Sequence, residues 1–286
     1  MSVKVFAHRG ASAYFAEHTR AAYLQALADG ADGVECDLHL SADGELVLLH
    51  DDDVDRTSNG TGFVSALTLA QLRALDFSSW KGAVIPPLFG GTAEQLLTLD
   101  ELLEILAQAG RSVDLAIEFK YGAVFDTRLV DATLERLRLH GWSPEQSMAG
   151  AVRVSFMSFH PKALKYLAQK VPAQFLCQLL EEVKDVQETL GGAPGGAPNT
   201  ASLLRRAMAE GERLVDSGVA SIAGPGVDYL YAHPENAARW LGAGRSFRVW
   251  TVDTEENLAL CQALGVTEVT SNRPAEIRAL LDRISH

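Results

Sequence analysis

The chain has 286 residues, of which 47% are hydrophobic and 22% are charged, as in an ordinary folded protein. Its 25 basic and 37 acidic residues leave a net charge of −12, which argues against a surface for nucleic acid or anionic membranes, since both require clustered Lys and Arg. No apolar run approaches the roughly 18 residues of a membrane span, and the sequence enters a strand pattern at once, so we expect no signal peptide. Three scattered cysteines without a CxxC pair predict reduced thiols in a cytoplasmic protein.

Short β-rich runs alternate with helical patterns over nearly the whole chain. The expected strands cover residues 3–7, 33–40, 113–119, 151–157, 174–179, 219–223, 247–252 and 266–270, and the helical segments between them include 19–29, 99–108, 126–139 and 161–169. Strands that alternate with helices predict parallel βαβ units. Eight strands in a chain of about this length favour closure into a (β/α)8 (TIM) barrel over an open doubly wound sheet.

Two stretches interrupt this repeat. A short hairpin over 40–49 precedes a segment from about 51 to 98, which has its own helical pattern and several Gly and Pro residues. We interpret this segment as an insertion into a single domain that spans residues 1–286. The second stretch, 191–200, contains GGAP twice and is typical of a flexible loop. A loop after the fifth strand of a barrel lies on the catalytic side, so a lid role stays open. Asn199 or Thr200 can cap the helix that follows.

Two acidic residues lie two positions apart in the second expected strand, in the run Gly33-Val34-Glu35-Cys36-Asp37. The side chains of Glu35 and Asp37 therefore leave the same face of the strand, while their apolar neighbours face the helical shell. Two carboxylates inside a barrel are costly unless a cation compensates them. Carboxylate oxygens suit Mg²⁺, Mn²⁺ or Ca²⁺, so the pattern predicts one divalent metal ion.

The third expected strand ends with a similar pair, Glu118 and Lys120, on one face. Its carboxyl end is where the active sites of barrel enzymes lie. Glu118 would complete a site of three carboxylates, and Lys120 would neutralise a phosphate oxygen beside it. The alternative is a structural Glu–Lys bridge at the rim of the barrel.

Two histidines follow apolar runs at expected strand ends. His8 is followed by Arg9 and Gly10, and His50 is followed by Asp51. The guanidinium of Arg9 can bind a phosphate in a fork geometry, and glycine lets the chain turn sharply. Hydrolysis of a phosphodiester needs a base for the attacking oxygen and an acid for the leaving oxygen, and two histidines meet that need near neutral pH.

Other polar residues near this run carry weaker signals. The acidic run after His50 fails the EF-hand pattern, because Arg56 stands where Gly is needed and Gly62 where Glu is needed. His39, on the same strand face as Asp37, is an interior polar residue or a site residue. No GxxxxGK[ST] phosphate loop occurs in the sequence. We interpret the rest of the acidic run as a solvated turn in which one carboxylate orients His50: Asp52, Asp53 and Asp55.

These motifs, in this order and with these gaps, resemble those of the glycerophosphodiester phosphodiesterase family. The matching pieces are HRG at 8–10, the ExD pair at 35 and 37, HD at 50–51 and the ExK pair at 118 and 120. Weaker matches at 250–253 and 270–274 extend the resemblance over nearly the whole chain. Each piece alone is a weak signal, whereas the ordered set is strong.

The resemblance implies a (β/α)8 barrel with a small insertion after the second strand, and a divalent metal ion. The roles that it implies fall on eight residues: Glu35, Asp37 and Glu118 as metal ligands, His8 and His50 as the acid/base pair, Arg9 and Lys120 as contacts of the phosphoryl group, and Trp250 in the pocket for the glycerol or head group. A tryptophan of the barrel core is the alternative for Trp250.

One departure from the family pattern concerns the loop after HRG. The family commonly carries PENT there, whereas this chain reads Ala16-Glu17-His18-Thr19. Glu17 can still order Arg9 or approach the metal, and Thr19 can still cap the following helix. His18 in place of Asn leaves the geometry of the pocket and the substrate range open.

The patterns predict metal-assisted hydrolysis of a phosphodiester. The resemblance implies that the substrates are glycerophosphodiesters, which are small molecules, and that the products are glycerol phosphate and an alcohol. The patterns and the resemblance leave open the metal, the head group, the oligomeric state, which histidine is the acid, and whether water or a hydroxyl of the substrate attacks. One rival keeps the barrel and the metal but acts on lysophospholipids or sphingolipids, as a phospholipase D does; the acidic net charge weighs against it. A non-catalytic barrel that binds phosphate esters is the other rival, although binding alone needs no acid/base pair.

Overall fold

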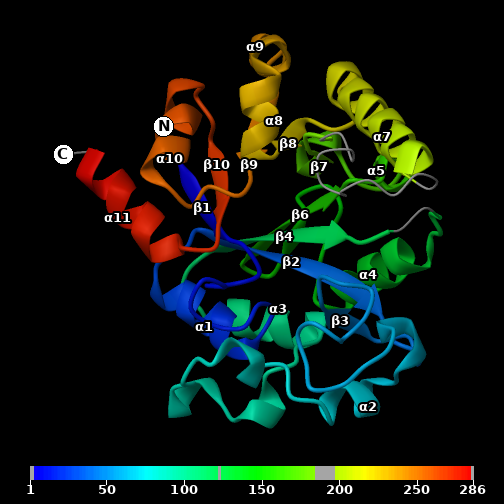
Figure 1. Cartoon of the computed structure of the whole chain (residues 1–286), viewed down its shortest axis with the longest axis vertical. Coiled ribbons are helices and arrows are strands. Elements are labelled where there is room, and N and C mark those ends of the chain that lie inside the picture. Colours follow the sequence, from blue (N-terminus) through cyan, green and yellow to red (C-terminus); the bar gives the residue numbers. More distant parts are fainter. Residues whose placement is uncertain (1–2, 122–123, 184–196, 285–286) are drawn as a thin grey trace.

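In the computed structural model, which describes residues 3–121, 124–183 and 197–284, eight parallel strands close into a barrel with helices around it (Figure 1). The strand order is β1-β10-β9-β8-β7-β6-β4-β2, and the ring closes because β1 also pairs in parallel with β2. This arrangement confirms the predicted (β/α)8 fold. None of the described helices combines the length and the apolar content that crossing a membrane requires.

Each barrel strand overlaps one of the predicted ranges. The barrel strands are β1 (Lys4–Ala7), β2 (Gly33–Leu40), β4 (Val113–Phe119), β6 (Val152–Ser158), β7 (Leu176–Leu180), β8 (Ile222–Pro225), β9 (Ser246–Val249) and β10 (Glu268–Ser271). Two short strands pair antiparallel with barrel strands: β3 (Leu46–Leu48) with β2, and β5 (Met148–Ala149) with β6.

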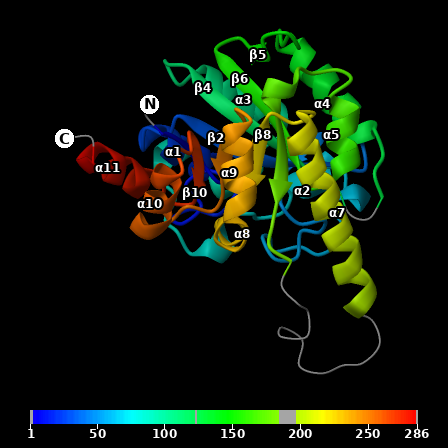
Figure 2. The ribbon, with the colours of Figure 1, turned by 90° about the horizontal axis from the view of Figure 1, so that it is seen from above.

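The helices pack on the outside of the barrel and on its loops. They are α1 (Arg20–Ala28), α2 (Leu69–Arg73), α3 (Leu99–Ala107), α4 (Arg128–Leu139), α5 (Pro161–Leu167), α7 (Ala197–Ser217), α8 (Val227–Ala232), α9 (Pro234–Gly242), α10 (Glu255–Ala263) and α11 (Pro274–Ile284). Figure 2 shows α5 and α7 side by side, and both contact β7.

The two faces of β2 have opposite surroundings, as its alternating sequence predicts. Val34, Cys36 and Leu38 are fully buried in the apolar layer that the strands form with α1, α3 and α4. Glu35 and Asp37 leave the other face of the strand, toward the interior of the barrel. The helical layer therefore holds the strand in a register that buries both carboxylates.

The segment between β3 and α3 has an apolar cluster of its own beside the barrel. It follows the predicted hairpin, in which Leu40 of β2 lies opposite Leu46 of β3. Its helix α2 is capped by Thr68 and Gln71, whose side chains bond each other's backbone N–H groups. The cluster consists of Val47, Leu49, Val54, Val64, Leu72, Phe77 and Leu96.

The structure corrects one predicted helix start. Helix α7 already includes Asn199 and Thr200, so neither residue caps it. The helix begins earlier because Pro198 stands in its first turn, where a proline gives up no intrahelical hydrogen bond. Residues 191–196 of the GGAP repeat lie outside the described residues, so a lid formed by this loop stays a prediction.

Gly10 brings the end of β1 into backbone contact with α1. Its φ is +82°, and a Cβ atom at this position would lie 2.6 Å from the carbonyl carbon of Ala22. The next residue, Ala11, donates its backbone N–H to the Ala22 carbonyl at 2.9 Å. Only glycine satisfies both the positive φ and the close approach.

We expect the change Gly10→Ala to lower the free energy of unfolding by about 3 kcal/mol, because a positive φ costs an L-residue roughly 1–2 kcal/mol and the new methyl group must displace backbone atoms. Gly44→Ala is the matched control: its φ is +84°, but a Cβ atom would meet nothing within 4 Å among the described residues. Urea unfolding of both variants measures the difference. Equal losses would show that the contact with Ala22 carries no cost.

Candidate active site

Three acidic side chains meet at the carboxyl ends of neighbouring strands. Glu35 and Asp37 come from β2, and Glu118 comes from β4. The parallel register places Asp37 directly beside Glu118. All three residues are buried, and each offers a carboxylate oxygen within 4.8 Å of the others. The structure thus brings together the three residues that the sequence pattern singled out for a metal ion.

Two cations lie against this acidic cluster. The Lys120 Nζ atom is 2.6 Å from Glu118 and 3.0 Å from Asp37. The Arg9 Nε atom is 3.2 Å from Asp37, and the Arg9 backbone N–H donates to Glu35 at 3.0 Å. The Glu–Lys bridge considered as an alternative does exist, but it also faces a second carboxylate and is part of the cluster.

The pKa values of the cluster diverge. Burial raises the pKa of Glu35 well above its usual range and also raises the pKa of Glu118. Burial would raise that of Asp37 as well, but the charge of Lys120 and a hydrogen bond from His18 outweigh it, so the pKa falls. Among the described residues, Glu35 Oε1 is buried without a hydrogen-bond partner. Three carboxylates against two permanent cations, with one oxygen unsatisfied, fit a divalent metal ion.

His8 lies at the end of β1 and is held by a chain of side chains. Its Nδ1 is 2.8 Å from the Asn272 side-chain oxygen. The Asn272 amide donates to Asp253 at 2.6 Å, so its oxygen faces His8 and the proton of His8 is on Nδ1. Burial, assisted by the charge of Arg9, lowers the pKa of His8 to about 4. A neutral imidazole thus presents an unprotonated Nε2 to the cavity.

His50 has a carboxylate partner instead. Its Nδ1 is 2.6 Å from Asp51, and Arg56 Nε donates to the same carboxylate at 2.6 Å. Burial and the charge of Lys120 lower the pKa of His50, while Asp51 opposes this change. The sequence led us to expect that Asp52, Asp53 or Asp55 orients His50. This expectation is wrong, because Asp51, which Arg56 holds in place by two hydrogen bonds, is the partner of His50.

Glu17 joins the two histidine-bearing loops. It accepts hydrogen bonds from Arg9 at 3.0 Å and from Arg56 at 2.8 and 2.9 Å. The sequence left two roles open for Glu17, which were to order Arg9 or to approach the metal. The structure shows that Glu17 orders Arg9. Arg56 also binds Asp51, so the loop after β1 and the segment after β3 are held together by one network of ion pairs.

His18 stands where the family has Asn, and it binds the acidic cluster. Its φ is +60°, in a region where Asn and His occur more often than other residues with a Cβ. Its Nε2 is 2.8 Å from Asp37 and its Nδ1 is 2.9 Å from the Tyr23 hydroxyl. That hydroxyl donates to the Glu35 carbonyl at 3.0 Å. His18 thus adopts a positive φ and makes a buried contact to Asp37.

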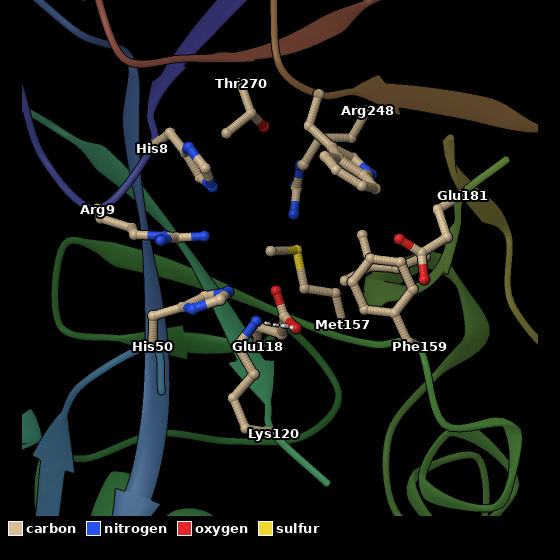
Figure 3. Close-up of a pocket in the computed structure, with 12 residues that line it drawn as sticks. His8, Arg9, His50, Glu118, Lys120, Met157, Phe159, Glu181, Arg248 and Thr270 are labelled. Carbon is tan, nitrogen blue, oxygen red and sulfur yellow. Dashed lines mark ion pairs between the residues drawn. The ribbon is translucent and has the colours of Figure 1, made fainter. Parts of the chain in front are cut away.

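These side chains open onto a cavity of about 160 Å³ (Figure 3). Figure 3 shows His8, Arg9 and His50 on one side of it, with Glu181 and Phe159 on the other. Trp250 also lines the cavity, and its indole N–H donates to the Gly224 carbonyl at 2.8 Å. Sequence patterns did not predict the wall opposite the histidines, because its residues follow no motif: Met157, Phe159, Leu179, Glu181 and Arg248. His39, in contrast, contacts the His50 carbonyl at 3.3 Å.

Fold and cavity together define a (β/α)8-barrel protein with a buried acidic cluster at the carboxyl ends of the strands, next to a cavity that one of its carboxylates, two cations and two histidines line. The chain belongs to the glycerophosphoryl diester phosphodiesterase family, whose model matches residues 8–276. This match confirms the resemblance found in the sequence.

Individual relatives agree with the family. The chain is 35% identical to a probable glycerophosphodiester phosphodiesterase 1 of Mycobacterium tuberculosis, over 97% of this chain and 92% of that protein. It is 31% identical to a glycerophosphodiester phosphodiesterase of Bacillus subtilis, over 94% and 83% of the two chains. The fold is similar to that of an Oleispira antarctica phosphodiesterase solved with its product sn-glycerol-3-phosphate (TM-score 0.74, 24% identity, 98% and 97% of the two chains). The chain is therefore an enzyme that hydrolyses glycerophosphodiesters, as predicted.

The change Glu17→Gln is expected to remove part of the acid dependence of stability. Burial would raise the pKa of Glu17 from 4.5, but the bonds from Arg56 and the charge of Arg9 lower it to about 2. Ionised Glu17 therefore stabilises the folded state above about pH 4.5, and this contribution is lost as the pH falls toward 2. We expect about 1–2 kcal/mol, since solvent around the half-exposed Arg56 screens the pair.

Urea unfolding between pH 3 and 7 measures this contribution as the difference between wild type and variant, which should shrink as the pH falls. Glu135→Gln is the control, because Glu135 is exposed on α4 and lies far from the network. A Glu17→Gln difference that stays constant with pH would contradict the assignment of the ion-pair network to stability.

Proposed function

We propose that this chain hydrolyses glycerophosphodiesters with one divalent metal ion held by Glu35, Asp37 and Glu118. The observation that carries this proposal is the buried, undercompensated acidic cluster, in which Glu35 Oε1 has no hydrogen-bond partner among the described residues. A bound Mg²⁺, Mn²⁺ or Ca²⁺ would polarise the phosphoryl oxygens and stabilise the charge that grows in the transition state. The product would be sn-glycerol-3-phosphate, the product that the Oleispira antarctica phosphodiesterase binds.

The cationic side chains of the cavity would hold the phosphoryl group. The guanidinium of Arg9 is fixed by Glu17 on one side and Asp37 on the other, and Lys120 is fixed by two carboxylates. Both cations therefore meet the substrate in a preset position and need little reorganisation during the reaction. Trp250 would line the space for the rest of the diester.

The two histidines would move the protons, and their partners favour different roles. Asn272 is a neutral partner, which leaves His8 unprotonated with Nε2 toward the cavity, as a general base requires. Asp51 is a carboxylate, which opposes the lowering of the His50 pKa by burial and by Lys120, and so favours, relative to a neutral partner, the protonated form that a general acid requires. We therefore assign the base to His8 and the acid to His50.

We expect His8→Ala and His50→Ala each to lower kcat for glycerophosphocholine by about 10²–10⁴-fold, the usual contribution of a positioned acid or base. The control is His140→Ala, because His140 also binds a carboxylate, Asp100 at 2.7 Å, but lies at the end of α4 and outside the cavity. Full activity of either cavity variant would overturn the assignment of its histidine.

A p-nitrophenyl ester of glycerol phosphate separates the two roles, since its leaving group departs without protonation. The loss in His50→Ala should shrink to less than tenfold with this substrate, whereas the loss in His8→Ala should persist. The reverse pattern would exchange the acid and the base.

The metal is tested by removal and by substitution. Chelation should abolish turnover, and Mg²⁺, Mn²⁺ or Ca²⁺ should restore it. Glu35→Gln should weaken Mn²⁺ binding, measured by calorimetry, by about 10²-fold or more, because a liganding oxygen loses its charge. Asp114→Asn is the control, since Asp114 lies at the opposite end of β4 and pairs with Lys4. Turnover that survives complete metal removal would overturn the proposal.

We further propose that residues 1–286 form one catalytic domain in which 51–98 are an insertion, because this segment supplies Arg56 to the network and packs around an apolar cluster of its own. The three cysteines are buried free thiols, which supports the predicted cytoplasmic location.

A further inference from the structure

The wall opposite the histidines has a composition of its own. Phe159 follows the end of β6 and Trp250 follows β9, and their rings meet edge to face, with centroids 5.5 Å apart at 89°. The indole N–H of Trp250 is bonded to the Gly224 carbonyl, so its polar atom is not available to a ligand. The carboxylate of Glu181 also lines the cavity on the side of Phe159, across from the histidines (Figure 3).

The Glu181 carboxylate has no ion pair or hydrogen bond with any described residue. It is half-buried at the end of β7, where burial raises its pKa and the charge of Lys120 opposes the change. It is also not one of the three residues whose ligand atoms converge on a common point. A carboxylate in this place repels the phosphate of any diester that enters the cavity, and a positive charge on the substrate would offset this repulsion.

The charges at the two ends of the site are opposite in sign. A groove next to the cavity begins at His8 and Arg9 and passes Lys81 and Arg273. It also contains two carboxylates, but Glu17 is bonded to Arg9 and Arg56, and Asp253 is bonded to Asn272, so the cations of Lys81 and Arg273 set the charge of that side. Glu181 lies on the other side, where the described residues that share its wall are mainly apolar: Met157, Phe159, Leu179 and Trp250. This division favours a substrate with a phosphate at one end and a cation at the other.

The chemistry of the wall also selects the kind of cation. Aromatic faces and a single carboxylate attract a positive charge without offering the three acceptors that a primary ammonium group uses. A quaternary ammonium group donates no hydrogen bond and presents apolar methyl groups, which can pack against Phe159 and Trp250. In a choline ester, this group is joined to the phosphate by two methylene groups, so both ends fit one small cavity.

We propose that Glu181, Phe159 and Trp250 form a subsite for a quaternary ammonium head group, so that this enzyme prefers choline-bearing glycerophosphodiesters. The inference rests on the proposed function, in that it assigns the head group of the same diester. Glu181 acts as the specificity-determining residue. Arg248, the other charged residue of this wall, is paired with Glu268 at 2.7 Å, whereas Glu181 has no ion pair among the described residues and would stay uncompensated beside a neutral head group.

The test compares glycerophosphocholine with its neutral isostere, in which a 3,3-dimethylbutyl group replaces choline and only the charge is lost. For the wild type, kcat/KM should favour the choline ester by about tenfold, the effect of a partly desolvated cation site. Glu181→Gln should bring this ratio close to one, because it lowers kcat/KM for the choline ester and relieves the repulsion of the phosphate for the neutral ester. Glu182→Gln is the matched control, because Glu182 binds His233 at 2.8 Å and does not line the catalytic cavity, and it should keep the wild-type ratio.

Two results would overturn the subsite. If Glu181→Gln lowers kcat/KM equally for both esters, Glu181 binds the glycerol hydroxyls or supports the site in general. If the variant keeps the wild-type ratio, the head group lies elsewhere.

A calorimetric titration separates this inference from the proposed function. Phosphocholine should bind the wild type about tenfold more tightly than 3,3-dimethylbutyl phosphate, and Glu181→Gln should remove the difference. If neither diester is hydrolysed but this difference is present, the proposed function fails and the subsite stands. Equal binding of the two phosphates to the wild type would overturn the subsite whether or not the diesters are hydrolysed.

Discussion

The burial of three carboxylates at one end of the barrel is the constraint on which the rest of the site depends. Glu35, Asp37 and Glu118 lose nearly all contact with water, and such charges are tolerated only with cations and hydrogen bonds around them. Arg9, Lys120 and His18 supply part of this compensation, and the remainder fits a divalent ion. The same requirement accounts for the positive φ values of Arg9 (+57°) and His18 (+60°), because this backbone conformation turns both residues toward the cluster.

The segment after β3 is part of this arrangement rather than an appendage to the barrel. It carries His50 and Asp51 at its start and Arg56 shortly afterwards. Arg56 binds both Asp51 and Glu17, so the position of His50 is tied to the loop that orders Arg9. The apolar cluster of the segment fixes its fold, and the ion pairs then fix its orientation on the barrel. A change in this segment would therefore reach His50 and the loop that carries Arg9 without altering the barrel strands.

The barrel divides the site between its two halves. The residues of the acidic cluster, its cations and both histidines come from β1, β2 and β4 and from the loops near them. The aromatic and acidic wall comes from β6, β7 and β9. Because each strand end carries an independent loop, the head-group wall can vary while the phosphate side stays intact. The strands that hold the phosphate side of the site (β1, β2 and β4) are therefore not the strands that hold the proposed head-group wall (β6, β7 and β9).

The sequence by itself determined the alternation of strands and helices, the shared face of Glu35 and Asp37, and the ordered motifs that mark the family. These features depend on the two-residue period of a strand and on short spacings along the chain. The tertiary structure alone decided the partner of His8, since Asn272 lies 264 positions away, and the choice of Asp51 as the partner of His50 through Arg56. It also decided that His18 binds Asp37 and that Glu181 faces the histidines. Contacts of this kind depend on the closure of the barrel, which brings strand ends together regardless of their distance in the sequence.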